Sequence, residues 1–102
     1  MKVSFRQSGG YAGLTTGVDL DTADLSEEEA RRLSELVDRA DFDAVEAAAP
    51  ANRRAADQFS YELVVETPAG TRRIAFTDAQ KTEDVAMLLD FLRKRASPKP
   101  GF

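Results

Sequence analysis

The residue types that carry out most enzymatic chemistry are missing from this chain of 102 residues, which contains neither histidine nor cysteine. Their absence excludes imidazole acid–base catalysis, thiol nucleophiles, disulfides and the usual zinc ligands. Acid–base work would fall to aspartate, glutamate, lysine or tyrosine, and no two carboxylates are set by strands to face each other. We therefore expect a protein that is not an enzyme and that has no cofactor or metal of its own.

The charged residues also narrow the class of partner. The net charge is -4, and the acidic excess lies mainly between Asp19 and Glu46, whereas nucleic-acid binders usually present a basic face. The basic run at residues 93–95 closes a predicted helix, where cations suit the negative end of the helix dipole. Asp19, Asp21 and Asp24 could ligate calcium, but the alternating loop with its glycine and terminal glutamate is missing.

Length and hydropathy set the remaining bounds. The chain is long enough for one domain with a two-layer core. It has no run of about 18 apolar residues that could span a membrane, and residues 1–6 show no apolar stretch typical of a secretion signal. We expect a cytoplasmic protein.

Two predicted loops could bring side chains to a partner. The first contains Gly9, Gly10 and Gly13 around an aromatic residue, Tyr11, where solvent would favour a polar one. Such glycines can be turn residues alone, and Tyr11 could fold back over the end of a sheet. The second segment, residues 51–57, has no periodic pattern. It carries arginines, which could steer an acidic partner or simply be solvated, and it ends at Asp57, which could cap the following strand.

The elements that position these segments follow from hydrophobic periodicity. Ser26 and Glu29 form a capping box before the first helix, and Asp41 could cap a short second helix that Pro50 ends. The alternating segments are residues 2–6, 14–20, 59–65 and 73–76, and the helical segments are residues 27–40, 43–49 and 82–96. We expect Phe59, Tyr61, Phe76 and Leu92 to lie in the core.

The element order predicts an α+β fold, in which a four-stranded antiparallel sheet has its helices packed on one face. If the strands pair in the order two, one, three, four, every pair is antiparallel. The glycine-rich segment and residues 51–57 then lie at the same end of the strands, and the turn at residues 68–70 lies at the opposite end. We expect one domain over residues 1–97, followed by a disordered tail at residues 98–102.

Several short motifs follow one another along the chain. Ser8-Gly9-Gly10-Tyr11-Ala12-Gly13 comes after the first predicted strand, and Asp57 stands two residues before Phe59-Ser60-Tyr61. Further motifs are Ala40-Asp41-Phe42, Val65-Glu66 and residues 88–93. In this order they resemble the emfourin family, small bacterial proteins that inhibit thermolysin-like zinc peptidases and are often encoded beside a protealysin-like peptidase. The family typically has phenylalanine where this chain has Tyr11.

The resemblance implies an inhibitor that blocks the active site of a thermolysin-like, protealysin-like metallopeptidase with two adjacent loops. A catalytic zinc keeps one position open for water, and an inhibitor can offer it an oxygen ligand while an apolar side chain fills the neighbouring pocket. Asp57 is the candidate for the zinc of the partner, and Tyr11 is the candidate for the pocket. The implied partner-binding residues are Gly9, Gly10, Tyr11, Ala12, Gly13, Arg54 and Asp57.

A second interpretation remains open at this point. The same loops could belong to a small non-enzymatic regulatory or protein-interaction domain with an unrelated partner. In either case we expect the free protein to be a monomer, with no nucleic-acid or membrane partner.

Overall fold

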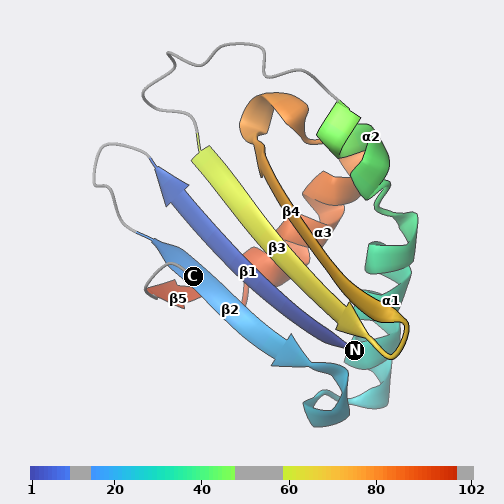
Figure 1. Ribbon diagram of the computed structural model, residues 1–102. Helices are drawn as coiled ribbons and strands as arrows, with labels where there is room; N and C mark the ends of the chain where they lie inside the picture. Colours follow the sequence, from blue (N-terminus) through green and yellow to red (C-terminus); the bar gives the residue numbers. More distant parts are fainter. Residues whose placement is uncertain (10–14, 48–58, 99–102) are drawn as a thin grey trace.

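The computed structural model describes residues 1–9, 15–47 and 59–98. Within them, five strands form one antiparallel sheet in the order β4-β3-β1-β2-β5 (Figure 1). The strands are β1 (Lys2–Gly9), β2 (Thr16–Asp21), β3 (Phe59–Thr67), β4 (Gly70–Thr77) and β5 (Ser97–Pro98). The α+β class and the order of the first four strands are confirmed.

The expected number of four strands is wrong, because β5 adds a fifth strand at the edge of β2. Pro98 pairs with Thr16 and Ser97 pairs with Gly17, so Pro98 belongs to the sheet although it was assigned to the disordered tail. Two residues are too few to show an alternating pattern. A proline inside a strand argues against pairing unless the strand lies at an edge, which is where β5 lies.

The helices cover one face of the sheet (Figure 1). They are α1 (Glu27–Arg39), α2 (Phe42–Ala47) and α3 (Glu83–Arg93), with two 3-10 turns, η1 (Thr22–Asp24) and η2 (Asp78–Gln80). The predicted caps are present: the Ser26 hydroxyl accepts the backbone N–H of Glu29 at 3.2 Å, and the Asp41 carboxylate accepts that of Ala44 at 3.0 Å. None of the described helices is long and apolar enough to cross a membrane.

The core lies between the sheet and the helices. Tyr61, Phe76 and Leu92 are buried there as expected, and Phe59 is partly buried against them. The largest fully buried side chains come from strands and helices alike: Phe5, Leu33, Leu36, Leu63, Ile74, Leu88, Leu89 and Leu92. The alternation within the strands and the helical spacing therefore predicted the inward faces correctly.

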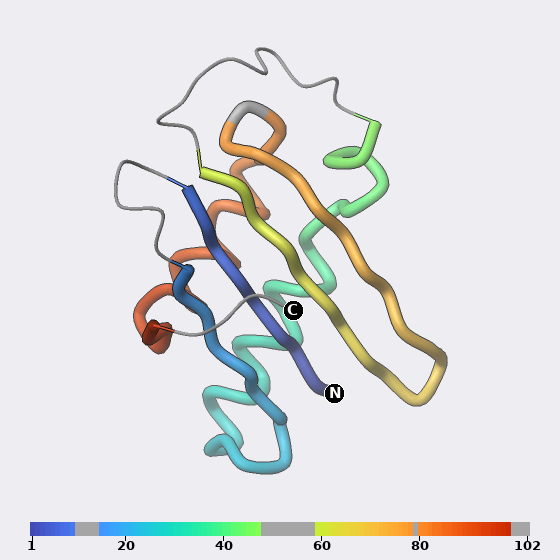
Figure 2. The backbone as a smooth tube through the Cα atoms, turned by 60° about the vertical axis from the view of Figure 1, so that its left-hand side comes forward, coloured from blue at the N-terminus to red at the C-terminus, as the bar shows by residue number. Residues whose placement is uncertain are grey.

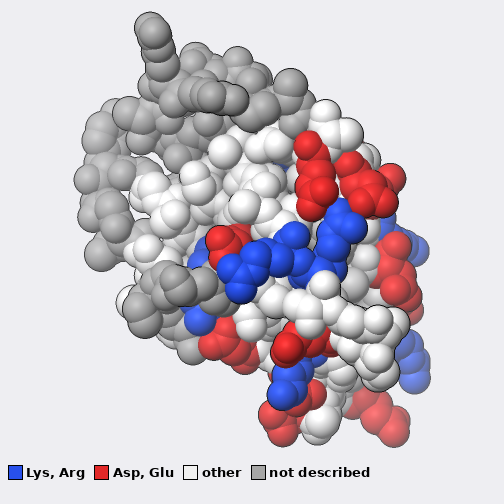
Figure 3. Space-filling model, in the orientation of Figure 1, with Lys and Arg blue, Asp and Glu red and all other residues white. Residues whose placement is uncertain are grey.

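The opposite face of the sheet is open and carries both signs of charge (Figure 3). The guanidinium of Arg6 on β1 bonds both carboxylate oxygens of Asp19 on β2, at 2.8 and 3.2 Å. Arg6 lies across Gly17, where an added Cβ would stand 2.1 Å from the carbonyl oxygen of Phe5 and 2.7 Å from Arg6 Cδ. Gly17 is therefore needed because any Cβ there would collide with the Phe5 carbonyl and press on the Arg6 side chain.

The register brings together the described residues that flank residues 10–14 and 48–58. Gly9, the last residue of β1, pairs with Phe59, the first residue of β3. Thr16, the first residue of β2, pairs with Gln7. The turn between β3 and β4 lies at the opposite end of the strands (Figure 2), with Gly70 at φ 144°. The strand order thus puts Gly9, Thr16 and Phe59, which lie next to the two predicted loops, at one end of the strands.

Candidate functional site

Only one of the predicted partner-binding residues lies in the described part of the chain. Gly9 closes β1 with φ 118°, a left-handed conformation that glycine adopts without steric cost. The other predicted residues, Gly10, Tyr11, Ala12, Gly13, Arg54 and Asp57, lie outside the described residues. The structure describes the strands to which these residues are joined, and the described residues next to them include the paired residues Gly9 and Phe59.

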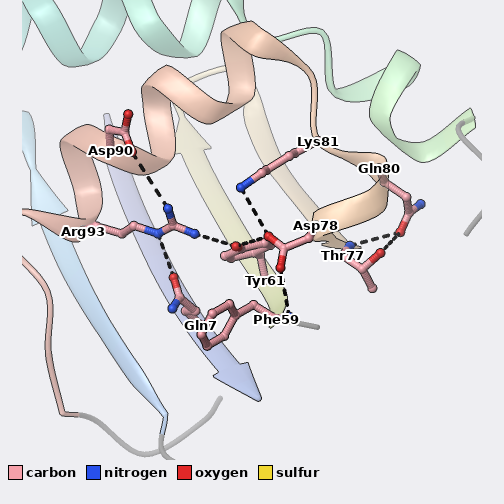
Figure 4. Close-up of polar contacts among 9 residues, drawn as sticks. All are labelled: Gln7, Phe59, Tyr61, Thr77, Asp78, Gln80, Lys81, Asp90 and Arg93. Atoms are coloured by element: carbon pink, nitrogen blue, oxygen red, sulfur yellow. Dashed lines mark hydrogen bonds and ion pairs between the residues drawn. The ribbon is translucent and has the colours of Figure 1, made fainter. Parts of the chain in front are cut away.

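A polar network supports the end of the sheet that contains Gly9 and Phe59, from the side of the helices (Figure 4). At its centre is Tyr61, which is only 2 % exposed. Its ring stacks against Phe5 and Phe76, with centroid distances of 6.3 and 5.2 Å. The hydroxyl reaches the end of the core, where it donates to Asp78 of η2 and accepts from Arg93 of α3. A buried tyrosine hydroxyl generally finds such partners.

Asp78 connects this network to the first residue of β3. One carboxylate oxygen accepts the Phe59 backbone N–H at 3.0 Å, while the other accepts from Tyr61 and lies 3.2 Å from Lys81 Nζ. Burial raises the pKa of Asp78, but the hydrogen bonds from Tyr61, Phe59 and Lys81 outweigh it, so the pKa lies below its ordinary value. Asp78 is therefore an anion at neutral pH and holds Phe59 by a charge-assisted hydrogen bond.

Arg93 extends the network to β1. Its Nε donates to Gln7 Oε1 at 2.8 Å, two residues before Gly9, and its guanidinium also lies 5.3 Å from the centre of the Tyr61 ring. Burial and the hydrogen bond to Asp78 raise the pKa of Tyr61, although Arg93 opposes the shift. The phenol is therefore neutral at physiological pH and can donate to Asp78 while it accepts from Arg93.

The polar side chains around Tyr61 are partners of one another. Every buried side-chain nitrogen and oxygen within the described residues has a hydrogen-bond partner. Among the same residues no cluster of acidic side chains could hold a metal ion. Asp19 instead pairs with Arg6, and Asp21 caps η1 by accepting the Ala23 N–H at 3.0 Å.

The basic run at the end of α3 has more specific roles than the predicted interaction with the helix dipole. Besides Arg93, Arg95 bonds Glu29 of α1 at 2.6 Å and lies 3.9 Å from the centre of the Phe91 ring. The hydrogen bonds from Arg95 and Ser26 lower the pKa of Glu29. Two of the three basic residues therefore connect α3 to other elements.

Sequence reasoning did not single out Gln7, Asp78 or Gln80. Their partners stand far away in the chain: 86 residues separate Gln7 from Arg93, and 17 separate Tyr61 from Asp78. One signal was present, because an inward-facing tyrosine on a strand needs a partner for its hydroxyl. The sequence alone could not say which residue that partner is.

The comparison with protein families adds to this geometry. The Emfourin family model matches residues 5–93, from β1 to the end of α3. The chain belongs to the Emfourin family. Membership of this family suggests an inhibitor of metallopeptidases rather than an enzyme, and it implies a metallopeptidase as the partner. No curated protein and no solved structure matches the chain. All the motifs that carried the resemblance lie within the matched range.

Proposed function

We propose that this member of the Emfourin family inhibits a thermolysin-like zinc peptidase of the protealysin type by occluding its active site. The observation that carries the proposal is the register between β1 and β3, which pairs Gly9 with Phe59. The two segments that contain the proposed contact residues are therefore attached to the sheet at neighbouring points. Membership of the family supports the inhibitor role and the class of partner.

The proposed mechanism divides the work between the two segments. Tyr11 fills the apolar pocket beside the metal, and Gly9, Gly10, Ala12 and Gly13 let the backbone enter a narrow cleft because they carry little or no side chain. Asp57 offers a carboxylate oxygen to the open position on the zinc of the peptidase. Arg54 contacts the rim of the interface.

Inhibition of this kind needs no cofactor or metal in the inhibitor itself. The free protein acts as a cytoplasmic monomer in this proposal.

The role of Asp57 is tested with thermolysin and a peptide substrate. Asp57→Asn keeps the shape of the side chain but removes its charge, so it should raise the inhibition constant by at least about tenfold, or about 1.4 kcal/mol. On zinc-free thermolysin the wild type should lose affinity and Asp57→Asn should lose much less, because both changes remove one shared interaction. Equal losses for the two proteins would show that Asp57 does not touch the metal.

Tyr11 is tested in the same assay. Tyr11→Ala should weaken inhibition by an amount typical of an aromatic interface anchor, on the order of 2 kcal/mol, and leave the melting temperature nearly unchanged. If the variant inhibits normally but melts early, Tyr11 packs on the protein itself. If the wild type neither binds nor inhibits thermolysin or a protealysin-like peptidase, the proposed function is wrong.

A further inference from the structure

The turn η2 contacts the described residues on both sides of residues 48–58. On the β3 side, the Asp78 carboxylate accepts the backbone N–H of Phe59 at 3.0 Å. On the α2 side, Gln80 Nε2 donates to the carbonyl oxygen of Val45 at 3.4 Å. Val45 belongs to α2 and is fully buried in the core. One turn of three residues thus touches the elements that precede and follow the second proposed contact segment.

This turn is itself held firmly. Gln80 Oε1 accepts the backbone N–H of Thr77 at 3.0 Å and lies 3.4 Å from its hydroxyl, so Gln80 folds back on the end of β4. Asp78 is fixed by Tyr61 from the core and by Lys81 from the following residues (Figure 4). The side chains that reach Phe59 and Val45 are therefore oriented by their other hydrogen bonds.

A second contact holds α2 against the same hairpin. The Arg72 guanidinium on β4 lies 2.8 Å from an Asp43 carboxylate oxygen and 3.1 Å from one of Glu46. The hydrogen bond to Asp43 raises the pKa of Arg72. These groups are exposed, and exposed ion pairs are individually weak, but they join α2 to β4, as Gln80 joins α2 to η2.

We propose that Asp78 and Gln80 form a clamp, here called the η2 clamp, and that both are positioning residues for inhibition. This inference rests on the proposed function. A segment whose two ends are fixed samples fewer conformations before binding and loses less entropy when it enters a cleft. The η2 clamp therefore increases affinity for the peptidase although neither of its residues needs to touch the peptidase.

Two variants open the clamp in different ways. Gln80→Glu keeps an oxygen for Thr77 but replaces the donor to Val45 with a carboxylate oxygen, so it releases the α2 side. Asp78→Asn removes the charge and leaves one acceptor oxygen for two donors, Phe59 N–H and Tyr61 OH, so it weakens the contact on the β3 side. The matched control is Thr67→Val in the turn between β3 and β4, at the opposite end of the strands. There the Thr67 hydroxyl accepts the Ala69 N–H at 3.2 Å and donates to the Gly70 carbonyl at 3.3 Å.

Three measurements are made on each variant: the inhibition constant against thermolysin, the urea midpoint, and the rate of limited tryptic cleavage after Arg53 or Arg54. We expect each clamp variant to raise both the inhibition constant and the cleavage rate by about fivefold or more, because η2 no longer holds one of the residues that flank 48–58. Thr67→Val should change the inhibition constant and the cleavage rate by less than about twofold, because its hydrogen bonds lie in the turn between β3 and β4, far from residues 48–58 along the strands.

Two results would overturn the clamp: unchanged inhibition and cleavage in both clamp variants, or equal changes in Thr67→Val at the same loss of stability. Should Asp78→Asn fail to fold, Gln80→Glu decides the question alone. If the wild type does not inhibit thermolysin, the proposed function fails and the tryptic cleavage decides the clamp by itself. Faster cleavage in the clamp variants alone then supports the clamp, and unchanged cleavage overturns it.

Discussion

Replacing Tyr61 with phenylalanine removes a single oxygen from the centre of the polar network and leaves the ring in place. The contacts of the ring with Phe5 and Phe76, at centroid distances of 6.3 and 5.2 Å, remain available to phenylalanine. What is lost is the hydrogen bond donated to Asp78 and the one accepted from Arg93. Any change in stability therefore reports on the network and not on core packing.

The expected loss follows from the partners of the hydroxyl. Hydrogen bonds to charged groups contribute about 1.5–3 kcal/mol when buried. The side chains of Asp78 and Arg93 are 31 % and 35 % exposed, so water partly replaces the lost bonds. We therefore expect Tyr61→Phe to lower the free energy of unfolding by roughly 1–2 kcal/mol, which for a domain of this size shifts the melting temperature by about 4–8 °C per kcal/mol.

Urea unfolding followed by circular dichroism measures the difference, and its dependence on pH gives an independent check. The pKa of Tyr61 is raised in the folded state, so its contribution is complete below its ordinary pKa of 10.0 and is lost as the pH rises above it. The wild type should therefore lose its advantage over Tyr61→Phe in alkaline solution. A difference below about 0.3 kcal/mol at neutral pH, or one that persists unchanged well above pH 10, would refute this account.

Three further changes test other parts of the fold. Leu88→Ala should destabilise the protein by roughly 2–5 kcal/mol in urea, because a fully buried side chain of α3 leaves a cavity; a loss well under 1 kcal/mol would contradict its place in the core. Gly17→Ala should cost roughly 1–3 kcal/mol by the same measurement, since its Cβ would collide with the Phe5 carbonyl, and a neutral result would exclude that close approach. The lowered pKa of Asp78 means that its contribution is present above its ordinary value of 3.8 and is lost as the pH falls below it. The stability difference between the wild type and Asp78→Asn should therefore shrink on acidification, and a difference independent of pH would contradict the assignment.

The features that were predicted correctly depend on neighbours in the sequence. The caps at Ser26 and Asp41 each involve residues within four positions of one another, and both caps are present. Of the predicted capping box the Ser26 half is confirmed, while the Glu29 carboxylate accepts from the Ser26 hydroxyl and from Arg95. Alternation placed Tyr61 and Phe76 inward. The strand order followed from the requirement that every pair be antiparallel, and the pairing of Gly9 with Phe59 agrees with it.

The features that were missed depend on residues far apart. No residue near Asp78 in the sequence indicates that Asp78 faces Tyr61. The sequence around Arg93 also does not distinguish a solvated side chain from one bonded to Gln7 at 2.8 Å. The edge strand β5 was missed because two residues carry no period. The proposed contacts of Tyr11 and Asp57 stay predictions, since both residues lie outside the described part of the chain.

The place of β1 in the sheet has a consequence for biosynthesis. β1 precedes the other strands in sequence, yet it occupies the middle of the sheet and pairs with β3, which begins at Phe59. The layer that covers its inner face includes α3, which ends at Arg93 (Figure 2). During translation Val3 and Phe5 must therefore wait, with at most a hairpin to β2, until nearly the whole domain has left the ribosome. The fold is completed as a unit once α3 has emerged, and a nascent chain stalled before α3 would present apolar surface to chaperones.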